Sequence, residues 1–339
     1  MTFKPLKISE HKIALKPIIQ GGMAIRVSTA PLAAAVANCG GVGLIAASGM
    51  AEAEIRAEIR LARSLQQNKT GLIGVNIMFA ASEFSKLVEI VIDEGIDLIV
   101  FGAGFSRDVF ELGKNSGVPI VPIVSSAKLA VIAKKKGATA IIVESGEAGG
   151  HLGTCNTIRN LIPEVRQALS QISNGDDEEV SLIAAGGVTS GSDIVDVMNL
   201  GANGVQMATR FVLSEECTVD DKFKKLYMET TEDELILITS PVGLQARAIS
   251  TPFSRSVVDE TVDKPKKCTK CLKHCSHSFC IINSLDSARK GDMEKGLFFA
   301  GENLGKYKDI LPVKTIFNNL EEEAKAYKSS LKEATLANI

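Results

Sequence analysis

The sequence predicts an α/β protein folded as a (β/α)8 barrel. Eight short apolar runs alternate with amphipathic segments between residues 17 and 209, and runs such as 182–187 (LIAAGG) are apolar without alternation. Continuous apolar runs are typical of strands that are buried on both faces of a parallel sheet. A doubly wound sheet is the competing fold, but it usually has about five or six strands, so the count of eight favours the barrel.

Each predicted strand is followed by a predicted helix or by a turn leading to one. The strands are expected at residues 17–22, 42–47, 73–79, 98–102, 119–124, 140–144, 181–186 and 204–209. Helices are expected at residues 51–67, 83–94, 126–136 and 192–200, and one more begins after Thr29 and ends at Cys39. Ser82 and Ser126 stand where a side chain caps the first turn of a helix.

The alternation stops near residue 229. A lysine- and cysteine-rich segment at 264–280 is followed by a predicted helix at 281–290 and a polar one at 313–333. We therefore expect residues 1–228 to form the barrel. Residues 229–339 are expected to form an irregular and helical appendage that packs on the barrel and covers it.

Composition narrows the class of protein. The 339 residues are 45% hydrophobic and 23% charged, as in soluble globular proteins rather than disordered ones, and the net charge of -2 argues against a nucleic-acid partner. No apolar run is long enough to span a membrane, and the N-terminus lacks the apolar core of a signal peptide. The seven cysteines suit a reducing compartment, so we expect a cytoplasmic protein; a homodimer is one open possibility.

Candidate site residues follow the predicted strands, because active sites of such barrels lie at the C-terminal ends of the strands. His151 stands in a glycine-rich loop after the sixth strand and could act as a base or an acid near neutral pH, although a lone histidine is often structural. The glycine pair after the seventh strand could hold a phosphate or simply form a tight turn. The residues singled out are Gly22, Met23, Asn76, Glu144, Gly149, Gly150, His151, Gly186, Gly187, Gln206, Met207, Ala208 and Thr209.

Several of these segments together resemble one superfamily of flavoenzymes. They are PIIQGGMA, AAAVANCGGVGLIAA, GVNIMF, VESGEAGGHLG, LIAAGGV and GVQMATRF, in this order between residues 17 and 211. The chain resembles the FMN-dependent nitronate monooxygenases (2-nitropropane dioxygenases) and the flavin-dependent enoyl-acyl-carrier-protein reductases. The resemblance covers the predicted barrel but not the cysteine-rich segment.

The resemblance implies a TIM barrel that binds FMN without a covalent bond. Gly22 and Met23 would lie against the flavin ring, Asn76 and Glu144 would bond ring or ribityl groups, and His151 would be the catalytic base or proton donor. The ribityl chain and phosphate would be held by Gly149, Gly150, Gly186, Gly187, Gln206, Met207, Ala208 and Thr209.

The resemblance also implies a reaction. The expected one is the oxidation of alkyl nitronates with oxygen, and the alternative is NAD(P)H-dependent reduction of an enoyl thioester. A glutamate at position 144 and the EAGGHLG segment are typical of the reductases. A third alternative, from another class, is a flavin- or metal-binding protein without turnover.

Four cysteines lie close together in the C-terminal part. Cys268, Cys271, Cys275 and Cys280 could hold zinc or an iron–sulfur cluster, although their spacing matches neither a standard zinc ribbon nor a ferredoxin. A reduced, solvated loop and a redox dithiol are the alternatives. Five lysines between residues 264 and 273 would favour thiolates and could attract an anionic substrate.

Overall fold

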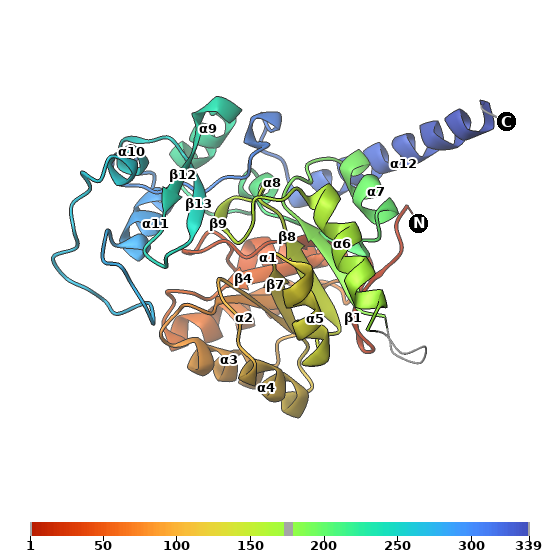
Figure 1. Ribbon diagram of the computed structural model, residues 1–339, viewed down its shortest axis with the longest axis horizontal. Helices are drawn as coiled ribbons and strands as arrows, with labels where there is room; N and C mark the ends of the chain where they lie inside the picture. Colours follow the sequence, from red (N-terminus) through yellow and green to blue (C-terminus); the bar gives the residue numbers. More distant parts are fainter. Residues whose placement is uncertain (1, 173–178, 338–339) are drawn as a thin grey trace.

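The computed structural model describes residues 2–172 and 179–337, in which eight parallel strands close into a barrel (Figure 1). Their spatial order is β10-β11-β3-β4-β5-β6-β7-β8. The barrel strands are β3 (Ile18–Gln20), β4 (Val42–Ala46), β5 (Leu72–Met78), β6 (Leu98–Gly102), β7 (Ile120–Val124), β8 (Ala140–Glu144), β10 (Ser181–Ala185) and β11 (Gly204–Met207). The predicted (β/α)8 barrel is confirmed.

A helix follows each barrel strand. The helices are α1 (Ala30–Asn38), α2 (Glu52–Leu65), α3 (Phe84–Asp93), α4 (Asp108–Ser116), α5 (Ala127–Lys135), α6 (Ile158–Ser170), α7 (Gly191–Asn199) and the short α8 (Thr209–Val212). Three of these helices, α4, α6 and α8, had no predicted bounds. In α6 the signal was available, because its buried residues recur at helical spacing.

One predicted helix cap is confirmed and one is wrong. Ser126 caps α5, since its hydroxyl accepts a hydrogen bond from the Leu129 N–H at 3.4 Å. Ser82 does not cap α3, which begins at Phe84 without a side-chain cap. Its N–H instead donates to the Cys271 carbonyl at 3.0 Å, so this loop holds the cysteine-rich segment.

The interior of the barrel is a packed apolar core. It is closed at the N-terminal end of the strands by an antiparallel hairpin of β1 (Leu6–Ser9) and β2 (Lys12–Ala14). Leu6, Ile8 and Ala14 of this hairpin are fully buried in one cluster with side chains of the barrel strands. Only the opposite end of the barrel is therefore left for a ligand.

The C-terminal part is built around a small antiparallel sheet. β12 (Leu235–Thr239) and β13 (Gln245–Ile249) pair with each other, and β13 pairs with β9 (Gly150–Leu152) from the loop after β8. The remaining helices are α9 (Asp221–Glu229), α10 (Pro252–Val258), α11 (Ile281–Arg289), α12 (Val313–Ala337) and the 3-10 turns η1 (Glu232–Glu234) and η2 (Leu304–Lys306). The boundary at residue 229 stays a prediction, and this sheet crosses it.

The last helix, α12, packs beside α7 on the outside of the barrel and then projects beyond it (Figure 1). Its residues Ile316, Phe317 and Leu320 are buried in the core that surrounds the strands. No helix in the described chain combines the length and apolar character that a membrane span requires.

The contact between α1 and β4 permits a test of the packing. A Cβ atom added to Gly43 would lie 2.0 Å from the Ala33 carbonyl oxygen, so Gly43→Ala forces the helix off the strand. We expect a loss of about 2–3 kcal/mol in the free energy of unfolding, measured by urea denaturation.

Gly95→Ala is the control for that substitution. Gly95 has a φ of 69°, but a Cβ atom there meets nothing within 4 Å. It should therefore cost only the strain of the left-handed backbone, about 1 kcal/mol. Equal losses for the two variants would contradict the described packing of α1 on β4.

Candidate active site

The C-terminal ends of the barrel strands open into a cavity of about 770 Å³. The barrel loops form one side of it, and apolar side chains of the C-terminal part, including Leu272, Ile281 and Leu297, form the other. Predicted site residues that line this cavity are Gly22, Met23, Asn76, Glu144, Gly149, Gly150, His151, Gln206, Ala208 and Thr209. The structure thus brings together residues that the chain spreads over almost 190 positions.

The loop after β3 is fixed by a buried polar side chain. The Gln20 amide accepts a hydrogen bond from the Leu44 N–H at 3.1 Å and donates to the Ser28 hydroxyl at 2.8 Å. Ser28 in turn accepts a hydrogen bond from the Met23 N–H at 2.9 Å. The Ser28 hydroxyl therefore links the end of β3 at Gln20 to the loop at Met23. The chain at Gly22 passes so close to Asn76 that an added Cβ atom would lie 2.2 Å from the Asn76 Cβ.

Glu144 ends β8 and lines the cavity, and no charged partner among the described residues acts on its carboxyl. Burial alone raises the pKa of this carboxyl from 4.5 to about 7. Burial has this effect because a low-dielectric surrounding disfavours the charged form. Near neutral pH Glu144 therefore exists in both forms and can either donate or accept a hydrogen bond.

His151 lies on β9, where it pairs with Ala246 of β13. Its Nε2 atom is 2.7 Å from the Ser240 hydroxyl, and its ring meets the edge of Phe299 with the centroids 5.6 Å apart. Burial lowers the pKa of His151 to about 4, so the imidazole is neutral at physiological pH. A neutral imidazole beside a largely apolar cavity can accept a proton.

A smaller recess of about 80 Å³ adjoins the cavity and shares Glu144, Gln206 and Thr209 with it. Gly186 and Met207 line this recess, whereas Gly187 lines neither space. The backbone of Gly187 is left-handed, with φ 73°, and an added Cβ atom would lie 2.7 Å from the Glu147 carboxylate. Glycine is required there by the turn itself and by the carboxylate behind it.

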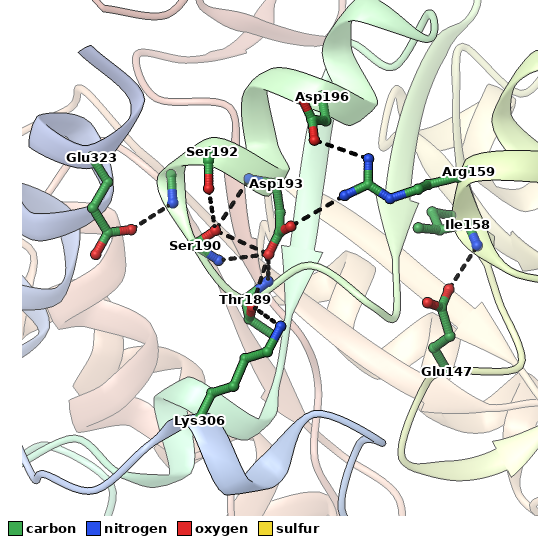
Figure 2. Close-up of polar contacts among 11 residues, drawn as sticks. Glu147, Ile158, Arg159, Thr189, Ser190, Ser192, Asp193, Asp196, Lys306 and Glu323 are labelled. Carbon is green, nitrogen blue, oxygen red and sulfur yellow. Dashed lines mark hydrogen bonds and ion pairs between the residues drawn. The ribbon is translucent and has the colours of Figure 1, made fainter. Parts of the chain in front are cut away.

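Figure 2 shows what lies behind this turn, at the start of α7. Ser190 and Asp193 form a capping box, in which each side chain accepts a hydrogen bond from the backbone N–H of the other residue. The Gly191 N–H donates to Glu323 of α12 at 2.7 Å. These side chains satisfy the first N–H groups of α7, so the N-terminus of this helix is capped within the protein.

Gln206 carries the one unsatisfied atom in this region. Its Oε1 is the single buried side-chain nitrogen or oxygen atom without a hydrogen-bond partner in the described chain. A buried acceptor without a donor costs about 1–3 kcal/mol. Gln206 borders both the cavity and the recess, so a bound molecule with an N–H or O–H group can supply the missing donor.

The metal site predicted at the four clustered cysteines stays a prediction. Cys271 and Cys275 pack against an apolar cluster that includes Leu272 and Phe279, while Cys268 is exposed. Within residues 2–172 and 179–337, no three histidine, cysteine or acidic side chains are arranged to hold a metal ion. Burial raises the pKa of the Cys271 thiol, and the neighbouring Cys280 and Cys275 add to this effect.

Three residues beside His151 were not predicted from the sequence. Ser240 and Phe299 contact His151, and the Tyr227 hydroxyl donates to the Phe299 carbonyl. All three lie at or beyond residue 227, where no strand–helix repeat indicated a position relative to the barrel. Their only signal is an irregular apolar pattern, which is shared by many residues without a role.

Comparisons with known proteins agree with this geometry. The nitronate monooxygenase family model matches residues 5–83 and 66–323. A probable nitronate monooxygenase of Staphylococcus aureus is 25% identical, over 90% of this chain and 93% of its own length. FabK from Thermotoga maritima is 31% identical, with a TM-score of 0.83 over 95% of this chain and 96% of that one.

A further relative from Mycobacterium tuberculosis is the (3aS,4S,5R,7aS)-5-hydroxy-7a-methyl-1-oxo-octahydro-1H-indene-4-carboxyl-CoA dehydrogenase. It is 32% identical over 69% of this chain, and the match spans only 63% of that protein's length. With the family model covering most of the residues, these matches exclude the alternative of a protein without turnover. The chain belongs to the nitronate monooxygenase family and is an enzyme, a flavin-dependent oxidoreductase.

Proposed function

We propose that this enzyme binds FMN and oxidises alkyl nitronates with oxygen, using His151 as a base. The observation that carries the proposal is the neutral imidazole of His151 at the wall of the 770 Å³ cavity. A neutral imidazole accepts a proton, whereas an acid catalyst would need the imidazolium, which burial disfavours.

The residues around the cavity fit FMN. The unsatisfied Oε1 of Gln206 needs a donor of the kind that a flavin or its ribityl chain offers, and Glu144 can both donate and accept. We assign the ring to Gly22, Met23 and Asn76. We assign the ribityl chain and phosphate to Glu144, Gly149, Gly150, Gly186, Gln206, Met207, Ala208 and Thr209, whereas Gly187 lines neither space and only shapes the turn beside them. FMN, when bound, supplies the acceptor for the electrons of the substrate and their transfer to oxygen.

His151 would act on the substrate through one ring nitrogen. For a neutral nitroalkane it takes the proton from the carbon next to the nitro group, and for a nitronate that is already ionised it orients the anion. The imidazolium and the nitronate formed in this step have opposite charges, and each stabilises the other in the poorly solvated cavity. This pairing compensates for the low pKa of free His151.

A second candidate is the NAD(P)H-dependent reduction of an enoyl thioester. The observation that favours a thioester substrate is the 32% identity to a protein named as a carboxyl-CoA dehydrogenase. A thioester also acidifies the neighbouring C–H group, and a cavity of 770 Å³ has room for more than a small nitroalkane. Lys270 lines the same cavity and could meet an anionic group of such a substrate.

His151→Asn tests the base. We expect the variant to keep its flavin and to lose about 100- to 10,000-fold in kcat/KM for neutral nitroethane, because general base catalysis contributes that much. The loss should be smaller for ethyl nitronate, which needs no deprotonation. His274→Asn, in the exposed part of the cysteine-rich segment, is the control and should leave both substrates unaffected. Equal losses on both substrates would contradict the role as base.

Anaerobic mixing of the flavin-loaded enzyme distinguishes the two candidates. Ethyl nitronate should bleach the visible band of the flavin, whereas NADH and NADPH should not. Rapid bleaching by a nicotinamide, followed by reoxidation with crotonyl-CoA, would replace the nitronate proposal with the thioester one.

Glu144→Gln tests the electrostatics of the site. In the apoprotein, the free energy of unfolding should fall as the pH rises from about 4.5 to 7, because the folded state resists ionisation of Glu144 while the unfolded chain does not. Glutamine cannot ionise, so the variant should gain up to about 3 kcal/mol over the wild type at pH 8 relative to pH 5. Urea denaturation at both pH values measures this gain.

Glu83→Gln is the matched control for Glu144→Gln, because Glu83 lies exposed at the mouth of the same cavity. Its substitution should change unfolding equally at both pH values. If Glu144→Gln behaved in the same way, the carboxyl would not be desolvated in the apoprotein.

A further inference from the structure

We propose that the cavity contains an apolar lobe that selects substrates with a medium-length alkyl group, and that Ile282 limits how long this alkyl group can be. This inference rests on the proposed oxidation of alkyl nitronates, and it concerns the part of the substrate that is not oxidised. It assigns the choice of substrate largely to side chains of the C-terminal part. The walls of the lobe are formed by Ile25, Met50, Ile281, Ile282, Leu285 and Leu297.

One wall of the lobe begins at the candidate base. The His151 ring meets the ring of Phe299, with the centroids 5.6 Å apart. Leu297, two residues earlier, belongs to the same apolar cluster as Phe299, whereas Phe298 between them is buried in the core that surrounds the strands. This alternation is typical of extended backbone, and Leu297 and Phe299 both line the cavity. An apolar surface therefore leads away from His151.

Helix α11 continues this wall. The Leu297 N–H donates a hydrogen bond to the Ser284 carbonyl of α11 at 3.0 Å, which holds the helix against the segment that carries Leu297. Ile281, Ile282 and Leu285 of α11 line the cavity. Residues 281 and 285 are four positions apart and so lie on the same face of the helix. The helix thus presents apolar side chains to the cavity.

The opposite wall comes from the barrel loops after β3 and β4. Ile25 and Met50 in these loops are buried and line the cavity. Gly49 marks the place where the two walls meet, because a Cβ atom added there would lie 2.6 Å from the Ile25 Cδ1 and 3.5 Å from the Ile282 Cδ1. The Ile282 side chain therefore extends from α11 to the barrel loops and bounds the lobe.

The chemistry of the walls indicates what occupies the lobe. Its six side chains are all apolar, and the charged residues that line the described cavity, Glu83, Glu144 and Lys270, are not among them. A charged or polar group between these walls would lose its water without gaining a partner, whereas burial of an alkyl group is favourable. None of the six residues is assigned to FMN, so the lobe is left to the alkyl group of the substrate.

Nitronates of increasing length test the lobe. With the flavin-loaded wild type and oxygen, we expect kcat/KM to rise from ethyl to butyl to hexyl nitronate, by up to about fourfold per added CH2 group that becomes buried. The reacting group is the same in all three compounds, so the alkyl group reports on binding between the walls. A kcat/KM that does not rise from ethyl to hexyl nitronate would overturn the lobe.

Two substitutions of opposite size test Ile282. Ile282→Trp should lower the ratio of kcat/KM for hexyl over ethyl nitronate by about 10-fold or more, because the larger side chain occupies space that the alkyl group needs. Ile282→Ala should move the preferred substrate to octyl nitronate. Damage to the fold would not shift the preferred length in opposite directions. Leu237→Trp, on the exposed side of β12, is the control and should leave the ratio unchanged. A preferred length that is the same in all variants would overturn the role of Ile282.

Binding of unreactive carboxylates separates the lobe from the proposed reaction. A carboxylate shares its negative charge between two oxygens, as a nitronate does, but lacks the nitrogen at the reacting carbon. Octanoate should perturb the visible spectrum of the bound flavin with a Kd at least about 10-fold lower than that of butyrate, and Ile282→Trp should reduce this difference. Equal Kd values for the two acids would overturn the lobe. Absence of nitronate turnover in the wild type would instead overturn the proposed function, while the carboxylates would still test the lobe.

Discussion

The site depends on one short interaction, the antiparallel pairing of β9 with β13. β9 belongs to the loop after β8, the sixth barrel strand along the chain, and β13 lies nearly 100 residues later in the chain. This pairing fixes His151 in the wall of the cavity and brings Ser240 to its Nε2 atom. Without it, His151 would lie on a glycine-rich loop with little to hold its ring, because Gly149, Gly150 and Gly153 surround it.

Desolvation sets the chemistry of the two titratable groups in the cavity. It acts on Glu144 and His151 in opposite directions, raising the pKa of the carboxyl to about 7 and lowering that of the imidazole to about 4. Both groups are thereby pushed toward their neutral forms. A cavity with neutral polar groups suits a substrate that becomes an anion during the reaction. The charge of that anion is then the strongest local electrostatic effect on the protonation of His151. Apolar walls strengthen that interaction by excluding water.

The sequence predicted the barrel and most of its rim, because both follow from local patterns. Apolar runs without alternation located the strands, and the topology of a parallel barrel then placed Gly22, Asn76, Glu144 and His151 at one end. Ser240 and Phe299 could not be found in this way, since their positions depend on long-range pairing that no periodicity encodes. The spacing of the four cysteines does not decide between a metal site and a loop of free thiols for a related reason: proximity along the chain does not fix where side chains point once Leu272 and Phe279 are buried.

The difference between local patterns and long-range pairing also explains why the substrate is harder to derive from the sequence than the cofactor. The barrel half of the cavity consists of main-chain turns and small polar side chains, a surface suited to the invariant parts of a flavin. The other half is formed by Leu272, Ile281, Leu297 and Phe299 from the C-terminal part. A fold of this kind can keep one cofactor site and exchange the facing wall, so related chains act on different molecules. Ser240 follows β12 in the same C-terminal part and contacts His151, so a single turn links the part of the chain that supplies this wall to the candidate base.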